Sequence, residues 1–164
     1  MTDNVFDIQA TCLFGEYLHI DSANEFSTMV GIRSGGVNVR ISANTGNDAE
    51  SDKIIPPMAY LCAIFGPKEK HPSKVGFFLL VEAKQPDGSY QLLHKTEPNY
   101  LDEGTIEISK TKKDYPDCDY FSFHIRGMFG PIPLKALTRV TAHAIINSKV
   151  IKCGETYFIH KADA

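Results

Sequence analysis

The run that decides the fold class is VGFFLLVEAK, residues 75–84. A short apolar run this rich in valine, leucine and phenylalanine is typical of a central strand, although periodicity alone also allows a buried helix. The sequence QPDGS follows it, in which Pro86 presets φ and Gly88 accepts a positive φ, as a tight turn requires. We therefore predict a strand at Val75–Lys84 that turns directly into a second strand at Tyr90–Lys95.

Segments with strand patterns continue in both directions from this pair. Met58–Phe65 is another near-continuous apolar run, and Phe6–Phe14 alternates with the two-residue period of a half-buried strand. Further strands are predicted at Phe26–Arg33, Val37–Ser42, Thr105–Ser109, Tyr120–Arg126, Val140–Ile146, Lys149–Lys152 and Thr156–His160. Many short strands with glycine- and proline-rich connections predict an all-β fold, an antiparallel two-sheet β-sandwich of immunoglobulin-like or jelly-roll-like type, with about ten strands.

The connections between these strands complete the expected topology. Ser34–Gly36 contains two glycines, which allow positive φ, so we expect a hairpin between Phe26–Arg33 and Val37–Ser42. Residues Ala43–Pro57 are polar and end in two prolines, which indicates a long loop. The one expected helical turn is Leu134–Leu137, so helix should occupy less than about a fifth of the residues, against a typical third.

Chain length and composition fit one domain. The chain has 164 residues, of which 43% are hydrophobic and 23% are charged, and about 150 residues is a usual domain size. No repeat and no shift in composition marks a boundary, so we expect a single β-sandwich domain over residues 1–164.

The charge balance and the length of the apolar runs argue against two classes of partner, nucleic acids and membranes. Seventeen basic and twenty acidic residues give a net charge of −3, whereas nucleic-acid binding depends on clustered basic residues. The basic stretches Lys68–His71 and Lys110–Asp114 each contain an acidic residue, so we expect no nucleic-acid partner. No apolar run approaches the roughly 20 residues of a membrane helix, so we expect no membrane partner.

Four cysteines bear on the cellular compartment. Cys12, Cys62, Cys118 and Cys153 form no CxxC pair, and their spacing matches no zinc site. The first residues carry no charged-then-apolar export pattern. We therefore expect unpaired, reduced thiols and a cytoplasmic location.

Two histidines could carry chemistry. His124 and His143 lie in the middle of predicted strands and could meet across a sheet, but neither has an acidic residue or cysteine two positions away to complete a metal site. The apolar neighbours Phe123 and Ile125 should occupy the core face, which predicts a solvent-facing His124. Ala142 and Ala144 predict the same orientation for His143, although Ile145 shares its face. No GxSxG elbow or P-loop occurs. We predict no catalytic residue, no metal and no cofactor.

Acidic residues gather in two predicted loops. They are Asp48, Glu50 and Asp52 in the first loop, and Asp114, Asp117 and Asp119 in the second. Spaced loop carboxylates can hold calcium, although the spacing matches no EF-hand. Solvated surface charge is the favoured interpretation, and a calcium site is the alternative.

The most unusual stretch is HIRGMFGPIPL, residues 124–134. It places Met128, Phe129, Ile132 and Leu134 in a connection that holds two prolines. Apolar residues in a connection either cap the core, which is the default, or face a partner. If they are exposed, these four side chains form a docking patch.

Four short packing and turn motifs lie between residues 12 and 88. They are CLFGEY at 12–17, FSTMVGI at 26–32, PMAYL at 57–61 and the turn PDG at 86–88. Together they resemble a family of small bacterial and phage β-sandwich proteins whose function is unknown. The resemblance implies a β-sandwich fold and supplies no activity or site residue to carry over.

These observations favour a non-enzymatic binding or interaction module, because the strands carry packing residues and no loop carries a catalytic motif. A β-sandwich that binds a small molecule or calcium is the second possibility. A hydrolase or lyase built from His124, His143 and the loop carboxylates is the third. The sequence leaves the oligomeric state open.

Overall fold

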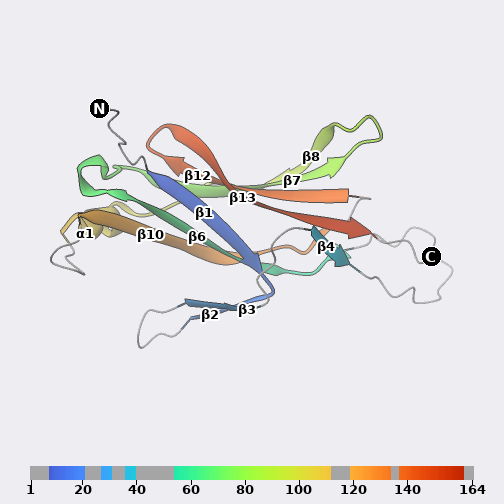
Figure 1. Cartoon of the computed structure of the whole chain (residues 1–164), viewed down its shortest axis with the longest axis horizontal. Coiled ribbons are helices and arrows are strands. Elements are labelled where there is room, and N and C mark those ends of the chain that lie inside the picture. The colour runs from blue at the N-terminus through green and yellow to red at the C-terminus, as the bar shows by residue number, and fades with distance from the viewer. Residues whose placement is uncertain are drawn as a thin grey trace, which may run out of the picture.

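The computed structural model describes residues 8–20, 27–30, 36–39, 54–111, 119–133 and 137–160. Strands account for 68% of these residues and helix for 10%, which confirms the expected all-β, two-sheet sandwich. Figure 1 shows the two layers, with β1, β6 and β10 in one and β7, β12 and β13 in the other.

The smaller sheet has three antiparallel strands. They are β1 (Gln9–Gly15), β6 (Met58–Pro67) and β10 (Tyr120–Phe129), in the order β1-β6-β10. Successive side chains of a strand point to opposite faces, so every second one points into the sandwich. On β10 the buried set is Phe121, Phe123, Ile125 and Phe129.

The larger sheet contains six strands. They are β4 (Gly36–Val39), β13 (Lys149–His160), β12 (Leu137–Ile146), β7 (Val75–Lys84) and β8 (Tyr90–Lys95), in that order, with β9 (Asn99–Tyr100) paired to β7. All pairings are antiparallel except that of β4 with β13. The predicted turn joins β7 to β8: Gln85 N donates to Ser89 O, and Gly88 has a φ of 87°.

Short elements complete the part of the chain that the structure describes. They are β2 (Tyr17–Ile20), β3 (Ser27–Val30), β5 (Ile54–Ile55), β11 (Ile132–Pro133), the 3-10 helix η1 (Lys68–Lys70) and the helix α1 (Glu103–Thr111). β2 pairs with β3 and β5 pairs with β11, both antiparallel. None of the described helices is long and apolar enough to cross a membrane.

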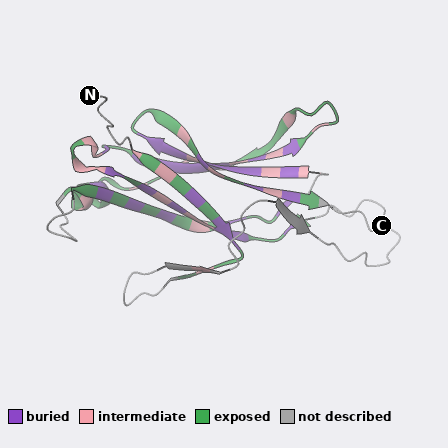
Figure 2. Ribbon diagram, in the orientation of Figure 1, coloured by how far each residue is buried: buried purple, intermediate pink, exposed green. Residues whose placement is uncertain are grey.

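The core lies between the two sheets. Figure 2 shows buried and exposed positions alternating along the ribbons. Among the largest fully buried side chains are Phe14 on β1, Ile64 on β6, Phe77 and Leu79 on β7, and Phe158 on β13. A single cluster of buried apolar residues joins the two layers, as expected for one hydrophobic core.

Two predicted elements are wrong. The hairpin between Phe26–Arg33 and Val37–Ser42 does not form, because β3 pairs with β2 whereas β4 pairs with β13. The predicted strand Thr105–Ser109 lies within α1. The Asp102 carboxylate accepts hydrogen bonds from the backbone N–H (2.8 Å) and hydroxyl (2.6 Å) of Thr105, which is a helix N-cap interaction.

Two smaller expectations also need correction. The predicted long loop Ala43–Pro57 includes β5, whose two isoleucines pair with β11. The helical turn expected at Leu134–Leu137 falls mostly outside the described residues, and Leu137 is the first residue of β12. Asn147 and Ser148 form the turn between β12 and β13, with Asn147 at a φ of 56°.

Candidate functional site

A cleft opens between the two sheets along the edge that β10 forms. Its volume is about 520 Å³, which is within the usual range for ligand pockets. One wall comes from the larger sheet, through Leu79 and Val81 of β7 together with Leu93, His94 and Thr96. The other wall is the segment Met128–Ile132, where β10 ends and β11 begins.

A second hollow of about 200 Å³ extends the cleft along the same edge. It shares four of its lining residues with the first hollow: Leu79, Thr96, Met128 and Phe129. The two hollows therefore form one elongated trough. Its far end adds the aromatic side chains of Tyr60 and Phe77 and the polar residues Glu97 and Asn99.

The wall from β8 is shaped by a bulge. Val81 pairs with His94 and Glu82 pairs with Leu92, so Leu93 is an extra residue without a register partner. Bulges of this kind redirect side chains near the edges of sheets. Leu93 lines the cleft, whereas its neighbour Leu92 does not.

Thr96 fixes the end of the same wall to β7. Its hydroxyl accepts a hydrogen bond from the Leu79 N–H at 2.9 Å. Its own N–H donates to the Leu79 carbonyl oxygen at 3.0 Å. These two bonds hold the segment after β8 in place without using a charged group.

The floor of the trough belongs to the core. The Tyr60 ring stacks on the Phe77 ring at 4.8 Å between centroids, and Phe129 meets Phe14 edge-on at 5.8 Å. In contrast, Met128 on the rim is 54% exposed and Leu93 is 37% exposed. The cleft therefore has a closely packed apolar floor and an accessible apolar rim.

The four residues predicted as a docking patch separate into groups. Met128 is exposed, whereas Phe129 and Ile132 are buried, and all three line the cleft. Met128 and Phe129 belong to β10, and Ile132 belongs to β11. Leu134 lies outside the described residues.

Sequence reasoning missed the opposite wall of the cleft. Leu79, Leu93 and Thr96 come from a segment that we assigned to packing and turns. The pair Leu92–Leu93 in a strand of otherwise mostly polar residues was the available signal, because two adjacent leucines break a strict alternation.

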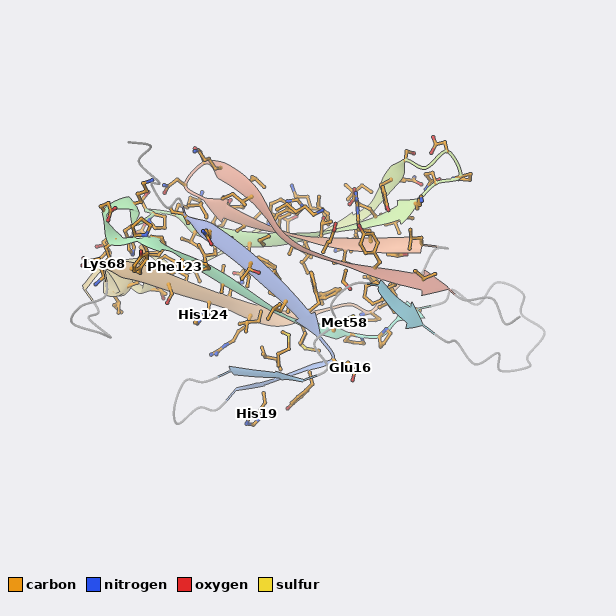
Figure 3. The ribbon with its side chains drawn as sticks, viewed as in Figure 1. Glu16, His19, Met58, Lys68, Phe123 and His124 are labelled. Carbon is orange, nitrogen blue, oxygen red and sulfur yellow. The ribbon has the colours of Figure 1, made fainter. Side chains whose placement is uncertain are left out.

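The two candidate histidines do not meet. His124 is on β10 in the smaller sheet, where it is exposed beside the buried Phe123, as predicted. Figure 3 labels His124 and Phe123. His143 is on β12 in the larger sheet, where it is half-buried rather than solvent-facing as predicted, because its ring stacks on Phe78 at 5.0 Å. Its Nε2 lies 3.0 Å from the Thr141 hydroxyl, and burial lowers the pKa of His143.

His71 forms a closer polar pair than either candidate histidine. Its Nε2 lies 2.6 Å from Ser109 Oγ, and its Nδ1 lies 2.9 Å from the Pro72 carbonyl oxygen. The Ser109 hydroxyl also lies 2.7 Å from the Ile106 carbonyl oxygen, so its single proton is shared between two acceptors. Because this pair joins α1 to the segment before β7, we interpret it as a structural anchor of the helix.

The structure bears on a metal site only in part. Within the described residues, no group of three or more His, Cys, Asp or Glu side chains is arranged to hold a metal ion. Five of the six loop carboxylates considered for calcium lie outside those residues: Asp48, Glu50, Asp52, Asp114 and Asp117. The sixth, Asp119, is exposed, and its carbonyl oxygen accepts a hydrogen bond from Lys68 N at 2.8 Å.

No protein-family model matches the chain, and no curated protein or solved structure matches it either.

Proposed function

We propose that this protein is a non-enzymatic binding module whose cleft accepts an extended apolar peptide segment of a partner protein. The observation that carries the proposal is the elongated trough between β8 and the Met128–Ile132 segment. Its rim exposes apolar side chains, which water solvates poorly, and such surfaces mark interaction sites.

The position of the trough favours a peptide over a compact ligand. Within the described residues, β10 has one strand partner, β6, so its far edge borders the cleft without a neighbouring strand. Extended peptides bind beside such edges by adding a strand, and pockets next to the edge take alternate side chains. The two joined hollows match that requirement for successive apolar pockets.

The surroundings of the cleft support a partner held by apolar contacts. The pair Leu93 and Met128 faces the opening from opposite walls. With a net charge of −3, the chain offers no general attraction for nucleic acid. We place the protein in the cytoplasm, because the three described cysteines are free and a reducing compartment keeps thiols in that state.

Selection from a phage-displayed library of random peptides tests the proposal. We expect apolar peptides to be enriched and to bind the purified protein in solution. Leu93→Glu should weaken their binding by about tenfold or more, because it puts a charge into the cleft. Leu92→Glu is the matched control, because Leu92 is exposed on the same strand but does not line the cleft, and binding should stay within about twofold.

Three outcomes would overturn the proposal. The first is a selection that enriches no peptide. The second is an equal loss of binding in Leu92→Glu and Leu93→Glu. The third is saturable binding of a small apolar dye, anilinonaphthalenesulfonate, that Leu93→Glu abolishes while no peptide competes with it, which would favour a small-molecule site.

A further inference from the structure

Three buried cysteines converge between the two sheets. Cys12 comes from β1 and Cys62 from β6 of the smaller sheet, whereas Cys153 comes from β13 of the larger sheet. The Cys62 and Cys153 sulfur atoms lie 3.9 Å apart although the residues are 91 positions apart in sequence. The fold therefore brings thiols from both layers into contact.

Local irregularities of the backbone create this contact. The pairing of β12 with β13 shifts register between Ala142 and His143, so that Ala142 faces Gly154, His143 faces Lys152 and Cys153 is the extra residue. A Cβ atom added at Gly154 would lie 2.5 Å from the Cys12 carbonyl oxygen. The bulge thus directs Cys153 inward, and the glycine lets β13 approach β1.

We propose that Cys62 and Cys153 form a modification site, where a peroxide oxidises the two thiols to a disulfide that joins the sheets. A disulfide requires a sulfur–sulfur distance of about 2.05 Å. The two sulfur atoms now lie 3.9 Å apart, so they must approach by about 1.9 Å for the bond to form. The 91-position separation means that the bond would close a large loop of the chain.

The alternative pair in the smaller sheet fits a disulfide less well. Cys12 and Cys62 are direct partners in the antiparallel register of β1 and β6. Directly opposed residues keep their Cβ atoms about 4.5–5.5 Å apart, whereas a disulfide favours about 3.5–4.5 Å.

Cys153 is the thiol that reacts first. Hydrogen bonds that the Cys153 sulfur accepts from Cys12, and to a lesser degree from Cys62, lower the pKa of Cys153. For Cys12, hydrogen bonding to Cys153 and Cys62, together with burial, raises the pKa. Thiolates are the reactive form. Cys153 also retains 9% of its surface in contact with solvent, against 0% for Cys62, and hydrogen peroxide is a small oxidant.

The chemistry proceeds in two balanced steps. The Cys153 thiol first releases its proton, and the resulting thiolate attacks one oxygen of hydrogen peroxide. The O–O bond breaks, and the hydroxide that leaves takes up the released proton to become water. This leaves a sulfenic acid on Cys153. The Cys62 sulfur then attacks the Cys153 sulfur, the S–O bond breaks, and the departing hydroxide takes the Cys62 proton. Two thiols and one peroxide become one disulfide and two waters.

Peptide mapping of the full-length protein tests this site. The protein is treated with hydrogen peroxide, unfolded, alkylated with N-ethylmaleimide and digested without reductant. We expect the Cys62 and Cys153 peptides as one linked species, while Cys12 and Cys118 carry the alkyl group. The linked species should disappear after treatment with dithiothreitol.

Two variants and one physical measurement sharpen this result. Cys62→Ala should abolish the linked species, whereas the matched Cys12→Ala should retain it. Oxidised wild-type protein should unfold at a higher temperature than reduced protein, because the cross-link restricts the unfolded chain. That increase should be absent in Cys62→Ala. A linked peptide that contains Cys12 or Cys118 would overturn the proposal, and so would complete alkylation of Cys62 and Cys153 in wild-type protein after peroxide treatment.

Discussion

The two long edges of the sandwich differ in how closely the sheets approach each other. At the edge where β1 contacts β13, Gly154 lies against the Cys12 backbone and small thiol side chains fill the gap. At the edge where β10 faces β7 and β8, the side chains of Tyr60, Phe77 and Phe129 stand between the layers, and a cleft remains. Figure 1 shows β1 and β13 running close to each other.

The comparison shows that side-chain volume sets the spacing between packed sheets. Interiors are close-packed, so layers separated by glycine and cysteine must come closer than layers separated by aromatic rings. The narrow edge therefore brings together thiols that can react with one another. The wide edge leaves an opening that a partner can fill. Four predictions test this difference, from the largest expected effect to the smallest.

Truncation of Leu79, a buried residue in the wall of the cleft, should have the largest effect on stability. Leu79 is 2% exposed and belongs to the core cluster as well as to the cleft. Leu79→Ala should lower the free energy of unfolding by about 2–5 kcal/mol, because it removes buried methyl groups and leaves a cavity. Urea unfolding measures the change. A loss below about 0.5 kcal/mol would show that this part of the cleft wall does not belong to the core.

A larger side chain at Gly154, where β1 and β13 lie close together, should have the next largest effect on stability. Gly154→Ala places a Cβ atom 2.5 Å from the Cys12 carbonyl oxygen, so the strands must separate. We expect the free energy of unfolding to fall by about 1–3 kcal/mol in the same urea experiment. Lys149→Ala, at an exposed position of the same strand, is the control and should stay within about 0.5 kcal/mol. Equal effects in the two variants would contradict the close approach of β1 and β13.

Mild acid should weaken the contact by which His71 holds α1 beside β10. Burial lowers the pKa of His71 in the folded state below its ordinary 6.5, so the unfolded chain binds protons more readily. Stability from this group is therefore present above about pH 6.5 and is lost as the pH falls from there toward the folded pKa. The thermal midpoint should decrease between about pH 7.5 and about pH 5.5.

His71→Gln should reduce that decrease, because the variant has no group to protonate at this position. The half-buried His143, whose pKa is also lowered by burial, should account for part of what remains, and His143→Gln measures that part. A pH dependence that is the same in His71→Gln as in the wild type would show that protonation of His71 does not destabilise the fold.

The rim of the cleft should contribute least to stability. Leu93 is 37% exposed, so Leu93→Glu should change the free energy of unfolding by about 0.5 kcal/mol or less. Urea unfolding of this variant, beside Leu92→Glu as its control, measures the change. A loss above about 2 kcal/mol in Leu93→Glu alone would mean that this wall of the cleft is core and cannot serve as a free binding surface.

Local sequence patterns were sufficient to predict a segment's conformation where its own residues determine that conformation. The run Val75–Lys84 forms β7, and the Pro86–Gly88 turn joins it to β8 as predicted. On β10, strict alternation fixed which side chains face the core, including the outward position of His124. These features depend on the two-residue period of a strand and on the allowed φ of turn residues, both of which are properties of the chain itself.

Alternation failed where it extended over too few residues. In Thr105–Ser109, Ile106 and Ile108 alternate with polar residues as in a strand. However, Ile106 is buried and Ile108 is 61% exposed, as expected on a helix. The decisive signal was Asp102, because its side chain caps the first turn. A capping residue before a short ambiguous segment therefore deserves more weight than the alternation within it.

By itself, the sequence determined the all-β class and most strand positions. Only the tertiary structure decided that β4 pairs with β13, that Leu79 and Leu93 line the cleft, and that Cys62 contacts Cys153. The physical reason is the range of the interactions. Strand propensity and turns arise from neighbours along the chain, whereas strand partners and the distance between sheets depend on how side chains from distant segments fill a shared interior.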